Sequence, residues 1–374
     1  MKPYYQNELV TIYHGDSLSV LKQMDSDTIN CCVTSPPYWG LRDYGEEGQL
    51  GLEETPEQYV ENMVKLFSEV KRVLRDDGTL WLNLGDSYSG SGGAGNQFGQ
   101  LENDGFNKYK QGNSGLKPKD LCGIPWRVAF ALQSDGWYLR QDIIWHKPNP
   151  MPESVTDRCT KSHEYIFLLS KSKKYYCDMD AIKEPITESS KKRLSQNIDG
   201  QKGSERVPGK TNGTMKAVGH KNLQSKGQEP NSFHKTRANG EPDKIYDRRN
   251  KRSVWTIEDD EYQQFLMWKA EHASDKKDVW TVNTKPYSEA HFAVYPEELI
   301  EPCIKAGCPE GGTVLDPFSG SGTTVLVSVK QNKKGIGIEL SEDYIKISEK
   351  RIELFKTGLT SAEYAAGQTT LFGE

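Results

Sequence analysis

The stretch that decides the fold lies near the C-terminus and reads VLDPFSGSGTT, from Val314 to Thr324. It runs from a short apolar segment, typical of a buried strand, into a predicted helix that begins at Thr323. Gly320 and Gly322 allow the backbone to approach a ligand closely at the carboxyl end of the strand, where open α/β sheets bind their ligands. The sequence therefore predicts an α/β fold with a ligand site at this turn.

An acidic residue follows at the distance that a nucleoside site requires. The apolar segment Gly335–Ile338 ends at Glu339, 19 residues after Gly320, and such a carboxylate can accept hydrogen bonds from ribose hydroxyls. Val325 stands where a dinucleotide-binding GxGxxG pattern would have its third glycine, and the Gly-Lys of a P-loop is absent. These features predict a nucleoside cofactor without a pyrophosphate, with a purely structural turn as the alternative.

The rest of the chain alternates strand and helix signals. The clearest helix lies between Thr55 and Gly78, where Pro56 suits the first position and Thr55 with Gln58 forms a capping box. Further helices are predicted at Ile124–Leu132, at Glu297–Ala306, at Thr323–Lys330 and from the capping residue Ser341 to Phe355. Strands are predicted at Val10–Tyr13, Ile29–Val33, Thr79–Leu84, Ile143–Trp145, Tyr165–Leu169, Thr313–Leu315 and Gly335–Ile338. This alternation predicts a doubly wound parallel sheet that the two ends of the chain complete together.

A second turn, TSPPYWG at residues 34–40, follows the strand at Ile29–Val33. Its two prolines fix φ and remove two N–H donors, so the turn is stiff and presents carbonyl oxygens. Ser35 adds an acceptor oxygen and Tyr38 an aromatic face, which together suit a planar ring that carries an exocyclic amine. Accepting both N–H bonds would localise the nitrogen lone pair for attack on a methyl sulfonium. Taken alone, the turn is equally compatible with an ordinary connection.

Together the two turns resemble the S-adenosylmethionine-dependent amino-methyltransferases of DNA, and their order resembles the β class of that family. The resemblance covers most of residues 8–178 and 279–356. It implies a circularly permuted, Rossmann-like sheet and S-adenosyl-L-methionine as cofactor. It also implies three parts: an N-terminal catalytic half at 1–178, a basic target-recognition insert at 179–278 and a C-terminal catalytic half at 279–374.

The resemblance implies roles for individual residues. The catalytic turn is Ser35, Pro36, Pro37 and Tyr38. The residues expected to bind the cofactor are Asp16, Phe292, Asp316, Pro317, Phe318, Gly320, Gly322, Thr323 and Glu339. Among these, Glu339 matches the ribose-binding acid, Asp16 the acid that meets the adenine, and Phe292 belongs to a segment that resembles the lining of the methionine part.

Ser35 bears on the target base. In the family, the tetrapeptide begins with Asp or Asn in most adenine-N6 enzymes and with Ser in most cytosine-N4 enzymes. Ser35 therefore favours cytosine N4, with adenine N6 as the alternative. A cytosine-C5 enzyme needs a Cys nucleophile, and the only Pro-Cys pair, Pro302-Cys303, lies in a predicted helix. Methylation of RNA or of protein glutamine and a DNA-binding protein with a decayed active site are further alternatives.

A flipped target base would need partners outside the duplex stack. Lys147, Arg158 and His163 are the candidates for DNA contacts, since the two cations could hold phosphates. The alternative is that Trp145 beside them belongs to the core and His163 bonds a neighbouring loop. The segment Gly85–Gly115, with nine glycines in 31 residues, could close over cofactor or DNA, and plain disorder fits it equally well.

Charge separates an acidic body from a basic segment. Residues 181–252 hold 17 Lys and Arg against 8 Asp and Glu, a net charge of +9, whereas the whole chain has −5, so the rest carries −14. Clustered cations displace counterions from phosphates, so this composition fits a polyanion partner and a solvated insert equally well. The segment lies between the two catalytic halves, where the resembled family has its DNA-reading region, and this position favours double-stranded DNA as the partner. Its 14 apolar residues in 72, about 19%, give this segment little material for a core.

No apolar run approaches the length of a membrane span, so no membrane partner is expected. The seven cysteines show no C-x-x-C pair and no zinc spacing with histidines, which indicates reduced thiols and no metal site. The expected location is the cytoplasm of a prokaryote or a phage host. A homodimer and a cognate restriction endonuclease are left open as further partners.

Overall fold

The computed structural model describes residues 2–41, 45–46, 48–89, 115–148, 150, 153, 155–187, 189, 248–257 and 295–358. The chain divides into two compact units, Met1–Ala181 with Arg252–Glu374, and Ile182–Lys251. The predicted boundaries at residues 178 and 278 stay a prediction. The expectations for Phe292, for most of the Gly85–Gly115 segment and for most of the basic insert lie outside the described residues.

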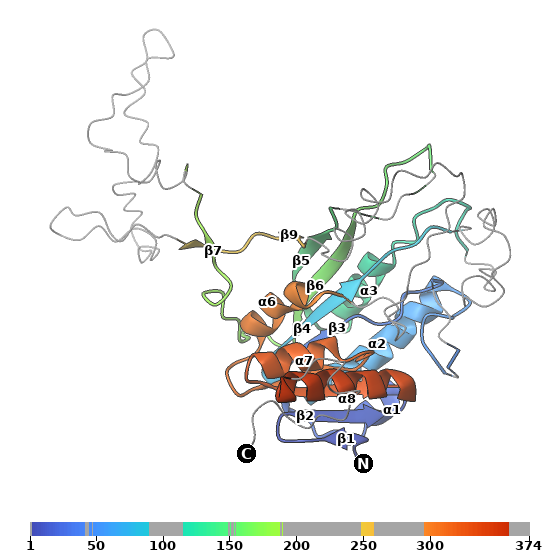
Figure 1. Ribbon diagram of the computed structural model, residues 1–374. Helices are drawn as coiled ribbons and strands as arrows, with labels where there is room; N and C mark the ends of the chain where they lie inside the picture. The colour runs from blue at the N-terminus through green and yellow to red at the C-terminus, as the bar shows by residue number, and fades with distance from the viewer. Residues whose placement is uncertain are drawn as a thin grey trace, which may run out of the picture. The chain divides into compact units, whose positions relative to one another are not determined.

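The first unit is built on a sheet of nine strands among the described residues, in the order β1-β2-β11-β10-β3-β4-β6-β5-β9 (Figure 1). The strands are β1 Tyr5–Gln6, β2 Val10–His14, β3 Ile29–Thr34, β4 Leu74–Leu84, β5 Tyr138–His146, β6 His163–Ser170, β9 Val254–Thr256, β10 Thr313–Asp316 and β11 Lys334–Glu339. Strands β2, β11, β10, β3 and β4 run parallel. The predicted α/β fold with a large, mostly parallel sheet is confirmed.

One predicted strand departs from the parallel arrangement. Strand β6 runs antiparallel to both β4 and β5. No helix occurs among the described residues that connect β5 to β6, and a parallel pair needs a long crossover connection, usually a helix. The sequence signal for β6 was correct, whereas its direction was not readable from that signal.

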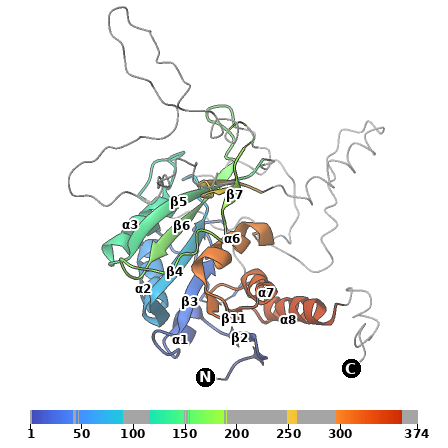
Figure 2. The same ribbon diagram turned by 90° about the vertical axis from the view of Figure 1, so that its left-hand side faces the viewer.

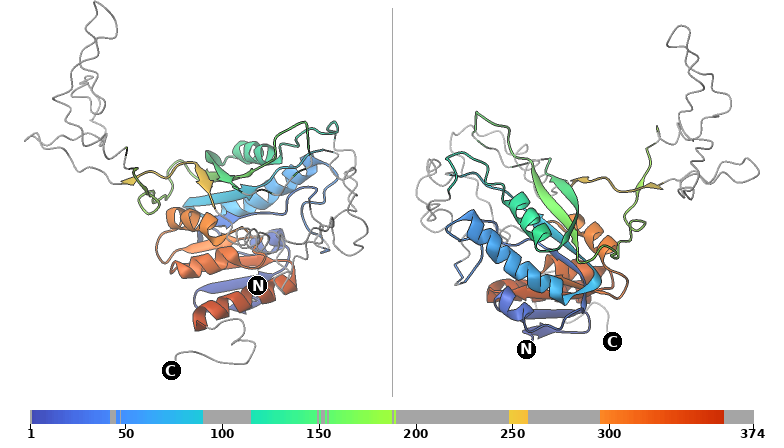
Figure 3. Two further views of the ribbon diagram at one scale, coloured as in Figure 1. Left: turned by 45° about the horizontal axis from the view of Figure 1, so that its top comes forward. Right: turned by 180° about the vertical axis from the view of Figure 1, so that it is seen from behind.

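Helices cover both faces of the sheet. Helices α1 Ser17–Leu21, α2 Pro56–Val73 and α3 Ile124–Ser134 lie on one face, and α6 Glu297–Gly307, α7 Thr323–Lys330 and α8 Glu342–Thr357 lie on the other (Figure 2). Seen from behind, α2 and α3 lie side by side across the sheet (Figure 3). One buried cluster joins the first helices to the sheet, and a smaller one joins β2 to α7 and α8. The chain is therefore doubly wound.

The two ends of the chain interleave in this sheet. Strand β10 lies between β3 and β11, and β11 lies between β10 and β2. In the register, Leu315 pairs with Cys32, and Glu339 pairs with His14. Strands from the N-terminal and C-terminal parts therefore bring their carboxyl ends to one edge, although they are about 280 residues apart in the sequence.

Local sequence signals explain most of the helix and strand boundaries. Thr55 Oγ1 accepts from Gln58 N at 3.2 Å and starts α2 as predicted. The helix ends at Val73 rather than near Gly78, because Leu74 is extended and pairs with Ile29 at the start of β4. Ser341 precedes α8 without a side-chain capping bond. Helix α1 and the short strands β1 and β9 had no prediction.

The second unit contains one described pair of strands. β7 Glu184–Pro185 and β8 Arg248–Arg249 run antiparallel. Glu184 forms ion pairs with Arg249 at 3.4 Å and with Lys251 at 3.8 Å.

Two general features complete the description. Within the described ranges, no helix is both long and apolar enough to cross a membrane. All seven cysteines lie in those ranges, and none forms a disulfide bond.

Candidate functional site

The two turns singled out in the sequence start side by side. Strands β3 and β10 pair in parallel, and their last residues, Thr34 and Asp316, are joined by a hydrogen bond of 2.6 Å from Thr34 Oγ1 to Asp316 Oδ1. Ser35 follows the first strand and Pro317 follows the second. Residues 35–38, the serine turn, and residues 316–324, the glycine turn, therefore share one edge of the sheet.

The carboxylate of Asp316 holds this edge together by accepting hydrogen bonds from the end of β3 and from the glycine turn. Its carboxylate accepts from Phe318 N at 3.0 Å, from Thr324 Oγ1 at 2.7 Å and from Tyr295 OH at 3.1 Å, in addition to Thr34. Its side chain is buried, and burial raises the pKa of Asp316. Because four protein donors surround the two oxygens, the structure places Asp316 beneath the ligand-facing surface rather than on it.

One cavity joins the two turns. Of the predicted residues, its lining includes Asp16, Ser35, Pro37, Pro317, Phe318, Gly320, Thr323 and Glu339. Several other lining residues could not be identified from the sequence, among them Ser17, Leu50, Tyr295, Ile338, Leu340 and Tyr344. The cavity therefore connects the serine of one turn with the acidic residue predicted to bind a ribose.

The acidic end of the cavity suits a nucleoside. Glu339 Oε2 accepts from Gly320 N at 2.7 Å, and its Oε1 accepts from Ser341 N at 2.9 Å. The two oxygens have about four lone-pair sites, more than the backbone N–H groups of Gly320, Leu340 and Ser341 use, so the carboxylate can accept from a further donor. Burial raises the pKa of Glu339, against the lowering effect of those backbone bonds. The side chains of Phe318 and Ile338 add apolar walls to the same cavity.

The two glycines of the turn are required for different reasons. Both have positive φ, +51° at Gly320 and +80° at Gly322. A Cβ at Gly320 would meet no heavy atom within 4 Å, whereas one at Gly322 would lie 2.0 Å from Ser348 Oγ of α8. Gly320 is therefore the position with open space beside it, and Gly322 allows the turn to pack on α8.

Helix α8 also holds the turn through Arg351. Its Nη1 donates to Ser321 O at 2.9 Å and to Thr323 Oγ1 at 2.9 Å. Its Nη2 lies 3.5 Å from Glu297 Oε1 of α6. The guanidinium thus ties the glycine turn to both helices, and the sequence contained no recognisable signal for this role.

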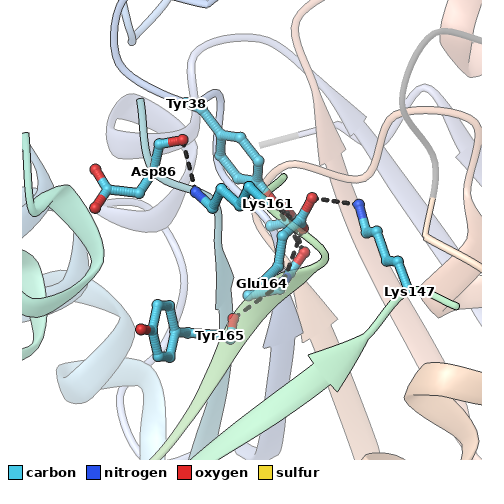
Figure 4. Close-up of polar contacts among 8 residues, drawn as sticks. Tyr38, Asp86, Lys147, Lys161, Glu164 and Tyr165 are labelled. Carbon is cyan, nitrogen blue, oxygen red and sulfur yellow. Dashed lines mark hydrogen bonds and ion pairs between the residues drawn. The ribbon is translucent and has the colours of Figure 1, made fainter. Parts of the chain in front are cut away.

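The serine turn is embedded in a network of hydrogen bonds. Ser35 Oγ donates to Asn83 Oδ1 at 3.1 Å and lies 3.3 Å from Tyr38 OH. Tyr38 OH lies 2.8 Å from Glu164 Oε2 and 3.0 Å from Asn83 Oδ1. Figure 4 shows Tyr38 and Glu164 pointing toward each other, with Lys147 on the far side of the carboxylate. Asn83 and Glu164 were not identified in the sequence.

Two further contacts fix the turn. Pro37 O accepts from Tyr59 OH of α2 at 2.9 Å. The ring of Tyr38 lies against the backbone of Gly85, where a Cβ would come within 2.5 Å of Tyr38 Cε2. Burial raises the pKa of Tyr38 well above its usual value, and the charge of Glu164 raises it further. The ring is thus held between the turn and the end of β4.

The residues predicted to contact DNA have partners within the protein. Lys147 forms an ion pair with Glu164 and lies 4.1 Å from the centre of the Trp145 ring. Arg158 forms an ion pair with Glu153 and packs on Tyr88. His163 Nε2 lies 3.4 Å from Tyr165 OH on the same strand, rather than on a neighbouring loop. Trp145 is buried, as the alternative interpretation expected.

A second lysine, Lys161, lies on the opposite side of Glu164 from Lys147 (Figure 4). Lys161 Nζ donates to Asp86 O at 2.7 Å, and burial lowers the pKa of Lys161. The Asp86 carboxylate instead accepts from the backbone N–H groups of Gly123 and Ile124 at the start of α3, both at 3.1 Å. Burial raises the pKa of Asp86. Asp86 thus serves as the cap that Gly123 itself cannot provide.

No group of three or more His, Cys, Asp or Glu side chains in the described part of the chain is placed to hold a metal ion. The arrangement offers hydroxyl and carbonyl acceptors beside a nucleoside-sized cavity.

Comparison with known proteins gives three findings. Residues 29–350 match the N6_N4 family of DNA methylases. The chain is 41% identical over 339 residues to the type II methyltransferase M.SmaI of Serratia marcescens, which spans 90% of this chain and 89% of the relative. It is also 41% identical over 345 residues to the type II methyltransferase M.Cfr9I of Citrobacter freundii, with 92% and 87% covered.

The third finding concerns the fold. A solved structure described as the PvuII DNA methyltransferase (cytosine-N4-specific) superposes with a TM-score of 0.57 and 19% identity, covering 98% of this chain and 93% of that one. At this identity the likeness shows the fold alone, a Rossmann-like methyltransferase sheet.

Proposed function

Because the chain belongs to the N6_N4 family of DNA methylases, we propose that it methylates the exocyclic N4 amine of cytosine in duplex DNA at a specific site. The methyl donor of this family, S-adenosyl-L-methionine, supplies a methyl group bound to a positively charged sulfur. The observation that carries the proposal is the single cavity that joins Ser35 to Gly320 and Glu339. The serine that opens the turn favours cytosine N4, and adenine N6 is the alternative with the same chemistry.

The residues around the cavity fit the nucleoside part of this donor. Glu339 would accept hydrogen bonds from the ribose hydroxyls. Phe318 would pack against the adenine ring, and Asp16, which also lines the cavity, would accept from its amine. Gly320 would allow the backbone to approach closely, since its Cβ position is open. Asp316, Gly322 and Arg351 would hold the turn in shape without touching the donor.

In this proposal, Ser35 would act as an acceptor for the target amine. Its hydroxyl donates to Asn83 Oδ1 at 3.1 Å, so its oxygen lone pairs remain for a donor in the cavity. The second acceptor would be the carbonyl of Pro36, because that of Pro37 accepts from Tyr59. Two accepted N–H bonds turn the nitrogen lone pair toward the methyl group and preorganise the transition state.

The DNA would bind over this cavity with its target base turned out of the duplex. Lys147 and Arg158 would then exchange Glu164 and Glu153 for phosphates, and His163 would lie beside them. The basic insert at 179–278 would read the bases in the grooves. The same proposal places the protein in a bacterial or phage-infected cytoplasm, where duplex DNA is available; it requires neither a homodimer nor an endonuclease.

The test is a chemical analysis of DNA. The protein and its Ser35→Ala variant are expressed in a bacterial host that lacks its own DNA methyltransferases, and plasmid DNA is digested to nucleosides for mass spectrometry. We expect N4-methylcytosine with the wild type only, always in one sequence context. N6-methyladenine alone would overturn the choice of base. An absence of modified bases, with folded protein that binds the donor, would overturn the proposed reaction.

A further inference from the structure

Contacts at hydrogen-bonding distance lead from Ser35 through Tyr38 to the carboxylate of Glu164, which does not line the cavity. Figure 4 shows the Tyr38–Glu164 part of this chain. Ser35 Oγ lies 3.3 Å from Tyr38 OH, and Tyr38 OH lies 2.8 Å from Glu164 Oε2. We propose that this chain is a proton relay and that Glu164 takes up the proton that the target amine releases. The proposal rests on the proposed function of Ser35 as the acceptor of that amine.

Asn83 sets the direction of the hydrogen bonds. Its Nδ2 donates to Tyr165 O at 3.0 Å, so its Oδ1 is the atom that faces the two hydroxyls. Tyr38 has a single proton, and its shortest contact is to the charged oxygen of Glu164. Because a hydroxyl bond to a carboxylate is stronger than one to an amide oxygen, Tyr38 donates to Glu164. Tyr38 O can then receive the proton of Ser35 when that hydroxyl rotates from Asn83 Oδ1, at 3.1 Å, to Tyr38 OH, at 3.3 Å.

The reaction needs such an acceptor. A bond forms between the amine nitrogen and the methyl carbon, and the carbon–sulfur bond breaks with its electron pair left on sulfur. The nitrogen then carries one proton too many. In the relay, this proton passes to Ser35 Oγ, the Ser35 proton to Tyr38 OH, and the Tyr38 proton to Glu164 Oε2. Charge balances, because the sulfonium charge is lost and the carboxylate becomes neutral.

Glu164 has the surroundings of a group that exchanges protons with solvent. Its side chain is 17% exposed, so water can reach the carboxyl group. Its Oε1 pairs with Lys147, while Oε2 faces Tyr38. Lys161 is the other cation near it, and Asp86 lies beyond Lys161. Each proton taken from the relay can therefore leave through the exposed side of Glu164, which resets the relay.

The test compares rates of a single turnover. Enzyme in excess, preloaded with the donor, is mixed with a duplex that carries the target, and methylated base is quantified against time in H2O and D2O. Glu164→Gln keeps the shape and the contact to Tyr38 but takes up no proton, and Tyr38→Phe removes the hydroxyl. The surface variant Glu57→Gln, whose partner is Arg127, is the matched control.

We expect Glu164→Gln and Tyr38→Phe each to slow transfer about 100-fold, the lower end of general-base effects. The double variant should be no slower than either single one, because both changes break the same path. The wild type should show a curved dependence of rate on deuterium content, and both variants a weaker one. Donor affinity by calorimetry and thermal stability should be retained.

Three outcomes would overturn the relay. The first is a Glu164→Gln rate within threefold of the wild type, and the second is a double variant whose loss is the product of the two single losses. The third is an unchanged deuterium dependence in the slowed variants, which a merely structural role would give. A wild type that methylates no duplex target would instead overturn the proposed function, and the two failures are therefore distinguishable.

Discussion

Thr34 Oγ1 donates a 2.6 Å hydrogen bond to Asp316 Oδ1 across the β3–β10 pair, between residues 282 positions apart in the chain. The same carboxylate holds Phe318 N and Thr324 Oγ1 of the glycine turn. One buried side chain therefore fixes both the strand that leads into the serine turn and the glycine turn, which we propose as part of the donor site. Any displacement of Asp316 should affect both sites together.

Replacing Asp316 tests this coupling. Asp316→Ala removes the common acceptor of Thr34, Phe318, Thr324 and Tyr295, so we expect the free energy of unfolding to fall by about 3 kcal/mol. Asp316→Asn keeps the shape, and the hydroxyls of Thr324 and Tyr295 can turn to accept from the new amide. The free energy of unfolding of Asp316→Asn should fall by about 1 kcal/mol. Urea denaturation measures the free energy of unfolding of both variants. Equal losses for Asp316→Ala and Asp316→Asn would contradict the predicted role of these hydrogen bonds.

The contrast between Gly320 and Gly322 is a second prediction. Alanine at either position has the strain of a positive φ, about 1 to 2 kcal/mol. At Gly322 it also collides with Ser348, which should add about 1 to 3 kcal/mol of overpacking. In a Ser348→Gly background, the cost of Gly322→Ala should fall to that of Gly320→Ala. The measurement is denaturant unfolding of Gly320→Ala, Gly322→Ala, Ser348→Gly and the double variant that combines Gly322→Ala with Ser348→Gly.

Gly320→Ala should also change the affinity for the methyl donor. Gly320→Ala projects a methyl group into the open space beside the turn and should weaken binding of S-adenosyl-L-methionine measured by calorimetry. If Gly320→Ala binds the donor as the wild type does, the glycine is needed only for its backbone conformation.

Much of the fold was readable because its signals are local. The strand at 313–316, the glycine turn and the helix from Thr323 follow from neighbouring residues. The capping box at Thr55 likewise marks the start of α2. The end of α2 was misplaced, because pairing of Leu74 with Ile29, a distant contact, overrides the Gly78 stop signal.

The site was readable only in part, because its supports come from distant segments. The motif residues Ser35 and Glu339 line one cavity. Asn83 and Glu164, by contrast, look in the sequence like an ordinary strand residue and a surface acid. Only the antiparallel pairing of β4 with β6 brings them together. Lys147 was predicted as a phosphate ligand, and its ion pair with Glu164 was not visible in the sequence.

Gly85 should be needed for the position of the Tyr38 ring. A Cβ there would lie 2.5 Å from Tyr38 Cε2, so Gly85→Ala should displace the ring and its hydroxyl. Single-turnover transfer should fall at least about tenfold, which corresponds to about 1.4 kcal/mol in the barrier. Donor affinity serves as the internal control, because neither residue lines the donor cavity. Unchanged transfer would mean that the ring adjusts without loss.

The pH dependence of donor binding should report Glu339. Burial raises the pKa of this carboxyl group above its usual value. Ribose hydroxyls donate to the ionised form, so affinity is complete above the raised pKa and is lost as the pH falls through it. The loss should therefore begin at a higher pH than for an exposed glutamate, whose pKa is about 4.3. Below the raised pKa, uptake of one proton limits the loss to about tenfold per pH unit.

Calorimetric titrations with S-adenosyl-L-methionine at a series of pH values from neutral downward measure this dependence. Glu339→Gln should bind more weakly than the wild type at neutral pH and show a flatter curve. Glu342→Gln is the matched control. Glu342 lies close by in the sequence but is exposed, and a hydrogen bond from Lys346 lowers its pKa. Its curve should follow that of the wild type. A Glu339→Gln curve as steep as the wild-type curve would assign the titration to another group and remove Glu339 from the ribose site.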